Sequence, residues 1–363
     1  MTKQPDFKRR VRERMAKTGE AYSTARSHLL RRPADHDRMA AALHISNGDA
    51  TDLAGTGLAR HILFWRDALH EGPVPAVDPE ELRRIRTAFL TQADADDRAE
   101  GVDMFAERDR IVEAHRDHEY VLWFEADVYD QLQIIQILAR LADLAVPARH
   151  ITLICIGEHP GFARFGGLGQ LTAEQLRRLP DTDASAQLTP AALQLAVRAW
   201  TAFRAPTPVG LGAIAATSSP ELRFLGEAFD RLSREYPSTR DGLSLTERRI
   251  LAAVADGATD AGTAFSRAAA RELRPYLGDT WCFAMMDRMA NGPVPLLAVE
   301  PSGRPVDRHT RVQPTATGER VLAGQAVHVS LNGIHRSIGG VHLVGGHARW
   351  RWDEGTETLI ERG

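Results

Sequence analysis

The sequence predicts an α/β protein, in which a Rossmann-like domain with a mostly parallel sheet precedes a mainly α-helical, winged-helix-like domain with a terminal β-hairpin. Three observations predict this class. Four short apolar runs in the first half each end in a burst of polar residues, helical patterns separate these runs, and the second half is mainly helical before a strand-rich end. The four runs are 43–46, 61–65, 120–124 and 151–156.

The chain has 363 residues, a formal net charge of -3 and two cysteines. We expect a basic extension over 1–40, the Rossmann-like domain over 41–205 with a helical insertion at about 79–118, and the winged-helix-like domain over 206–363. The sequence shows no apolar run long enough for a membrane span, no hydrophobic signal segment and no disulfide framework. We therefore expect a cytoplasmic protein without membrane contact, while its oligomeric state is not indicated.

The N-terminal extension is basic, with eleven Lys/Arg and five Asp/Glu in residues 1–40. Phe7, Val11 and Met15 are spaced by four, which predicts a short helix with one apolar stripe and cationic surroundings. Two interpretations stay open. The segment is either a solvated extension docked through that stripe or an arm that binds nucleic acid, because phosphate contacts need only Lys and Arg.

The polar bursts after the first two runs contain candidate catalytic and ligand-binding residues. They comprise Asn47, Gly48 and Asp49 after the first run, and the candidate ligand-binding residue Trp65 with Asp67 and Glu71 at the end of the second. Because the carboxyl ends of parallel strands meet at one edge of a sheet, we expect these residues to converge there. The Asn47–Gly48 turn is suited to an anion, whereas the glycine order departs from G-x-G-x-x-G, so NAD is not expected.

The third run is followed by Glu125, Asp127, Asp130 and Gln131. Asp127 and Asp130 are also well placed to cap and begin the next helix, a structural role that requires no catalysis. Glu125 precedes that helix directly after an apolar strand and is the better candidate for an acid, a base or a ligand of a divalent metal. His44 and His159 are further candidate ligand-binding residues, although a lone loop histidine such as His159 is more often solvent-facing.

The second half predicts three helices followed by a hairpin, which is the order of a winged helix. The helix in the recognition position, residues 279–289, is apolar and acidic, whereas a helix that reads a DNA groove needs cationic and amide side chains. We therefore expect a buried or partner-facing helix. Near the C-terminus, the alternation over 341–344 and 348–352 predicts a hairpin with Trp350 and Trp352 on one face, rather than a metal site of His335, His342 and His347.

Three separated motifs resemble the bacterial family filed as domain of unknown function 1835. The motifs are 44–49, 65–75 and 123–132, and the resemblance extends over residues 41–205. Residues 331–343 and 350–353 resemble the C-terminal part of the same proteins, where the family pattern has Asp-Arg-Trp and this chain has His335, Arg336 and Ser337. The resemblance implies no established reaction, and Arg336 is carried forward as a candidate ligand-binding residue.

Two hypotheses for function follow. The first is a protein that binds a nucleotide or phosphorylated metabolite, or a hydrolase- or transferase-type enzyme, with a carboxylate-rich site at the sheet edge. Its candidate catalytic residues are Asp49, Asp67, Glu71, Glu125 and Asp127. The second is a transcription-associated regulator that binds nucleic acid or a protein partner through residues 1–40 and the winged-helix-like domain. The first is favoured, because carboxylates and amides gather after the strands while the helix in the recognition position lacks cations.

Overall fold

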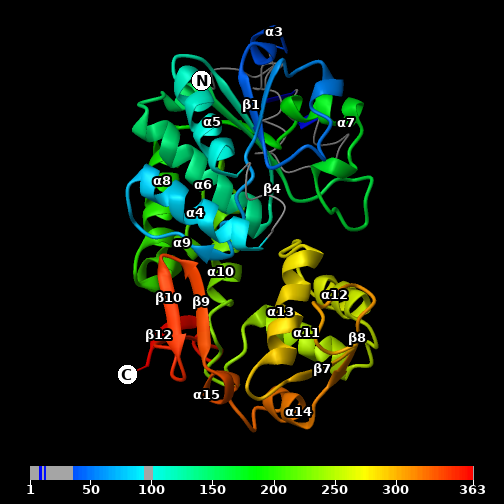
Figure 1. The fold of residues 1–363 in the computed structure, drawn as a ribbon. Coiled ribbons are helices and arrows are strands. Elements are labelled where there is room, and N and C mark those ends of the chain that lie inside the picture. Colours follow the sequence, from blue (N-terminus) through cyan, green and yellow to red (C-terminus); the bar gives the residue numbers. More distant parts are fainter. Residues whose placement is uncertain (1–7, 10–11, 14–35, 94–100, 363) are drawn as a thin grey trace.

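The computed structural model describes residues 8–9, 12–13, 36–93 and 101–362 (Figure 1). Most of the basic N-terminal extension, including the proposed apolar stripe, lies outside the described residues. Within it, residues 8, 9, 12 and 13 are helical and exposed. The helix α3, His36–Ala40, lies directly before the first strand of the sheet.

A five-stranded sheet has the order β2-β1-β4-β5-β6. Its strands are β1 (Leu43–Ser46), β2 (His61–Phe64), β4 (Tyr120–Glu125), β5 (Ile151–Ile156) and β6 (Ser185–Gln187). The first four are parallel, which confirms the mostly parallel sheet predicted from the apolar runs, and β6 pairs antiparallel with β5. The chain order reverses between β1 and β4, and this switch point is where open α/β sheets bind ligands.

Alternate residues of β4 are buried in two separate cores, one on each face of the sheet. Leu122 and Phe124 belong to a core with α6 (Val128–Asp143) and α8 (Pro190–Arg204). Val121 and Trp123 belong to a smaller core with the short α7 (Ala173–Arg178). Helices thus cover both faces, which is why β4 is a continuous apolar run instead of an alternating one.

Two helices fill the interval between β2 and β4, namely α4 (Pro79–Ala93) and α5 (Gly101–Ala114). A two-residue strand, β3 (Gly72–Pro73), precedes them. In Figure 1, α4 and α5 lie beside α6 and α8 on the left of the sheet. This position places the helical interval against the helices of one face rather than in solvent.

The second half contains a winged-helix-like segment. Its elements are α11 (Leu245–Ala255), α12 (Ala261–Ala270), α13 (Asp279–Asn291), β7 (Leu297–Glu300) and β8 (Arg311–Pro314). β7 and β8 form an antiparallel hairpin, and an isolated bridge joins Asp260, just before α12, to Arg311. This is the three-helix and wing order predicted from the sequence. The segment has its own core, which includes Ile250, Met286 and Val312.

The remaining helices connect these parts: α9 (Leu211–Ala215), α10 (Leu225–Ser233), α14 (Ala316–Leu322) and α15 (His328–Asn332). The main core contains residues from both sides of position 205, including Phe203 and Phe229. No helix in the described ranges is both long and apolar enough to cross a membrane.

The C-terminal strands form two hairpins, not the one predicted over residues 341–352. β9 (Ile334–Gly339) pairs with β10 (Val341–Gly345), and β11 (Trp350–Asp353) pairs with β12 (Thr358–Glu361). Trp350 and Trp352 lie on one face of β11 and Arg351 on the other, and Arg351 is as buried as the two tryptophans. β9 additionally pairs in parallel with β3, so the chain end returns to the first half.

Candidate functional site

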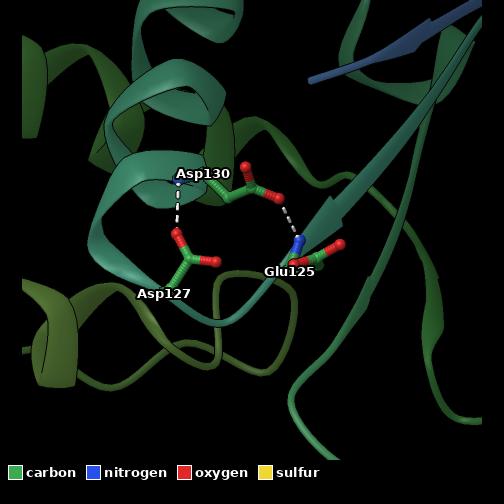
Figure 2. A group of neighbouring side chains, drawn as sticks. All are labelled: Glu125, Asp127 and Asp130. Carbon is green, nitrogen blue, oxygen red and sulfur yellow. Dashed lines mark hydrogen bonds between the residues drawn. The ribbon is translucent and has the colours of Figure 1, made fainter. Parts of the chain in front are cut away.

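Three carboxylates meet where β4 ends and α6 begins, as Figure 2 shows; we call Glu125, Asp127 and Asp130 the carboxylate trio. One oxygen of each lies within 4.8 Å of an oxygen of the other two. Asp127 is the N-cap of α6 and accepts a 2.9 Å hydrogen bond from the Asp130 backbone N–H, which confirms its predicted capping role. Asp130 accepts a 2.5 Å bond from the Glu125 backbone N–H.

Burial controls the protonation of the trio. Desolvation and then the charge of Asp127 raise the pKa of Glu125 to about 8. Desolvation raises the pKa of Asp127 to about 6, and it raises the pKa of Asp130 together with the charges of the two other carboxylates. A proton or a hard cation such as Mg²⁺ would relieve the repulsion within this group, so the trio offers acid–base capacity and oxygen ligands.

Two predicted amide residues contact the trio. The Asn47 side chain crosses the switch point from β1 and donates a 2.7 Å hydrogen bond to Asp130 Oδ1. Gln131 Nε2 donates to the Glu125 backbone carbonyl at 2.7 Å. Gly48 lies in the same turn as Asn47, where its carbonyl accepts a bond from Ser46. The structure therefore brings together five of the sequence-predicted residues at the expected edge.

A glycine loop closes over Glu125. The backbone N–H of Leu168 donates to Glu125 Oε1 at 2.6 Å. Gly167 has φ +142°, and a Cβ at this position would lie 2.6 Å from Glu125 Oε2. Only glycine therefore allows the loop to approach the carboxylate this closely.

Asp67 and Glu71 lie apart from the trio, and each pairs with an arginine. Asp67 forms a fully buried ion pair with Arg86, with an N–O distance of 2.7 Å. Glu71 lies 3.0 Å from Arg336, which comes from β9. Both carboxylates hold the loop after β2 in place, against α4 and against the C-terminal hairpin.

His44 and Trp65 are buried with their polar atoms satisfied. The His44 ring contacts the Met39 carbonyl through Nε2 and accepts a hydrogen bond from Trp123 Nε1, both at 2.9 Å. Trp65 Nε1 donates to the side chain of Gln136 at 2.7 Å. These contacts are those of core residues.

Asp49 and His159 lie nearer the surface. Asp49 is exposed and pairs with Arg66 at 3.0 Å. The half-buried His159 ring packs beside Phe162 and Phe165 and accepts a bond from the backbone of Gly161. Neither side chain contacts the carboxylate trio.

The second half covers the carboxyl edge of the sheet. Arg223 donates to the Cys155 carbonyl at 2.9 Å, and Arg274 donates to the Gly157 carbonyl at 2.7 Å. A cavity of about 1360 Å³, which we call the central cavity, is lined by residues of both halves of the chain. Its walls come from the loop after β2, from α4, from α13 and from the β9–β10 hairpin, elements that surround the middle of the molecule in Figure 1.

The wall of the central cavity is rich in cationic and aromatic groups. Its charged and imidazole side chains are Arg66, Arg288, Arg336, His335, His342 and Glu71, and its rings include Phe89, Phe105, Tyr129 and Trp281. Glu71, the one carboxylate among the described lining residues, is already paired with Arg336. Phe89 and Trp281 stack with an interplanar angle of 3°. Arg66 pairs with Asp49 and Arg336 also pairs with Glu235, so Arg288 is the lining arginine without an ion pair in the described part of the chain.

His70 lies beside the central cavity, behind its aromatic wall. Its ring is in edge contact with Tyr129, Tyr276 and Trp281. It is 4% exposed, and neither ring nitrogen has a hydrogen-bond partner within the described ranges. Desolvation lowers the pKa of His70 to about 4, so the ring is neutral near pH 7.

Sequence reasoning missed most of the cavity wall. The sequence does show that α13 has two faces, since Cys282, Met285 and Met289 are core residues while Trp281 and Arg288 are a helical repeat apart on the other side. That spacing indicates a second face of α13, which the core does not use. The elements opposite this face are α4 and the C-terminal hairpin, and they are too distant in sequence for the pattern to reveal them.

No protein-family model matches this chain, and no curated protein is significantly similar to it. The assignment of function therefore depends on the geometry of the site.

Proposed function

We propose that this protein binds an anionic small molecule with a planar ring, a nucleotide or an aromatic phosphorylated metabolite, in the central cavity. The observation that carries the proposal is the composition of the described cavity wall, where Arg288 has no ion-pair partner among the described residues and His335 and His342 add two imidazole rings. Arginine and imidazole N–H groups are the donors that phosphate oxygens accept.

The volume of the cavity and the aromatic side chains in its wall indicate the size of the ligand and its planar ring. Its 1360 Å³ exceeds the roughly 300–1000 Å³ of typical small-molecule pockets, so a nucleotide-sized compound has room. Trp281 and Phe89 offer stacking surfaces for a planar ring. Arg288 forms no ion pair in the described part of the chain and is available to a phosphate group.

The alternative of nucleic-acid binding through the winged-helix-like segment is less favoured by the same geometry. The residues Trp281, Ala284 and Arg288 form the side of α13 that would face a groove, and all three line the central cavity. A helix whose outer side lines a cavity is placed to contact a ligand or a neighbouring domain, and not the base edges of a DNA groove.

A thermal-shift panel tests the proposal. Nucleoside monophosphates and diphosphates and sugar phosphates are compared with the unphosphorylated parent compounds, because a ligand of the folded state raises Tm by mass action. We expect the phosphorylated aromatic compounds to raise Tm and their parents to do so less. The Arg288→Gln variant is expected to lose the difference between each pair.

Arg320→Gln is the matched control, because Arg320 is an exposed arginine of α14 outside the cavity lining. It should respond as the wild type does. The proposal fails when no phosphorylated compound raises Tm, or when Arg288→Gln and Arg320→Gln respond alike.

A further inference from the structure

A second, smaller cavity lies among α4, α5, α6 and α8. Its volume of about 70 Å³ is sufficient for several water molecules or one small anion, since a single water needs roughly 10–15 Å³. We call it the arginine pocket, after the five arginines in its lining: Arg83, Arg86, Arg108, Arg140 and Arg204. It is separate from the carboxylate trio.

The lining of the arginine pocket has an excess of positive charge. Its carboxylates are Asp67, Asp109 and Asp143, two fewer than its arginines. Asp67 is occupied by Arg86. Asp109 is shared, because it lies 3.0 Å from Arg83 and 3.1 Å from Arg108. Arg140 lies 3.7 Å from Glu113, which is outside the lining. With Glu113, four carboxylates serve the five arginines, and Arg108 only shares Asp109 with Arg83.

Arg108 is the most constrained of these side chains. Its Cζ atom lies 3.9 Å from the Trp65 ring centroid and 4.6 Å from the Phe105 ring centroid, and its side chain is 8% exposed. Desolvation lowers the pKa of the Arg108 guanidinium below its ordinary value, although the negative charge of Asp109 acts to raise it. The two rings fix the guanidinium, whose remaining donors need an acceptor.

Two buried donors at this pocket have no acceptor in the part of the chain that the structure describes, namely Nη1 of Arg108 and Nε of Arg140. Burying a charged donor without an acceptor carries a large free-energy cost. Both arginines line the pocket. The arrangement is thus one that an external acceptor would complete.

We propose that the arginine pocket binds a tetrahedral oxyanion, either free inorganic phosphate or the terminal phosphate group of a small metabolite. A phosphate anion offsets the surplus positive charge, and its oxygens accept hydrogen bonds from Arg108 Nη1 and Arg140 Nε. The small volume admits the phosphate group itself and excludes a nucleoside. This site is independent of the function proposed for the central cavity.

Calorimetric titration of inorganic phosphate into the full chain tests this proposal, in phosphate-free buffer with ionic strength held constant by chloride. We expect one phosphate per chain in the wild type, and binding at least about tenfold weaker in Arg108→Met and in Arg140→Gln. Arg116→Gln, which changes an exposed arginine just after α5, should bind phosphate as the wild type does.

A parallel titration with a phosphomonoester distinguishes the two sources of the phosphate group. Binding of phosphate alone identifies a free-ion site, and equal or tighter binding of the ester identifies a metabolite site. Absence of binding at tens of millimolar phosphate, or binding that survives both Arg108→Met and Arg140→Gln, overturns the proposal. Arg140 is more exposed than Arg108, so its variant decides the matter when Arg108→Met does not fold.

Discussion

Arg336 and Glu71 are 265 residues apart in sequence, yet their side chains form a 3.0 Å ion pair that joins the terminal hairpin to the loop after β2. The same guanidinium lies 3.1 Å from Glu235, which follows α10. Arg231 and Arg336 lower the pKa of Glu235 to about 2 despite its complete burial. Three distant segments thus meet at one buried cation beside the central cavity.

Arg336→Ala is predicted to destabilise the fold by about 3–5 kcal/mol, because it leaves Glu71 without its buried partner. Urea unfolding followed by circular dichroism measures this loss. Arg349→Ala removes an exposed arginine of the adjoining hairpin and should cost less than about 1 kcal/mol. Similar losses in the two variants would show that the buried pair has no special role.

His70 is predicted to make the protein less stable at acid pH. Its pKa is about 4 in the folded state and 6.5 ordinarily, so the unfolded state binds more protons between these values. Stability from this group is complete above pH 6.5 and decreases as the pH falls to 4, on the order of 3 kcal/mol in total.

The His70→Phe variant should abolish that part of the pH dependence, because a phenyl ring suits the aromatic surroundings and has no unpaired nitrogen. Chemical unfolding of wild type and variant across this pH range measures the effect. An equally steep acid loss in His70→Phe would contradict the assignment.

Glu125 is predicted to have the opposite effect on pH dependence. Its pKa rises from 4.5 to about 8 on folding, so the folded state binds more protons between these values and stability falls as the pH rises through them. Glu125→Gln should be more stable than the wild type near pH 8 and should show a flatter profile. Melting temperatures at several pH values check this, with the exposed Glu158→Gln as control. A Glu125→Gln melting temperature below that of the wild type at pH 8 would be the contrary result.

Gly72→Ala is predicted to destabilise the wall of the central cavity. Gly72 has φ +76°, and a Cβ there would lie 2.5 Å from the Phe89 ring. Strain and displacement of Phe89 together should cost at least about 2 kcal/mol. Gly48→Ala is the control, since a Cβ at Gly48 meets nothing within 4 Å. Equal melting temperatures for the two variants would exclude the clash.

The parallel sheet could be predicted from the sequence because each strand is a short apolar run bounded by turn residues, as in 120–124. The partner of a strand was harder to predict. Gly345 and Gly346 resemble the turn of a hairpin between 341–344 and 348–352. In the structure, however, β10 pairs with β9, the strand that precedes it in the chain. Alternation gives the period of a strand and not the identity of its neighbour.

The carboxylate trio was accessible to sequence reasoning because Glu125, Asp127 and Asp130 are close in the chain. The arginines that pair with Asp67 and Glu71 were not, because Arg86 and Arg336 reach them from other elements. The central cavity was missed for the same reason. Its wall combines α4, α13 and β9, whose contact depends on how the two halves pack.

The most direct measurement of the central claim is calorimetric titration of the best phosphorylated aromatic compound into wild type and Trp281→Ala. Loss of a stacking ring should weaken binding roughly tenfold or more. Phe283→Ala, on the same helix but outside the central cavity, should bind as the wild type does. A saturable one-to-one isotherm that weakens only in Trp281→Ala is the predicted result, and equal affinity in all three proteins would contradict the account.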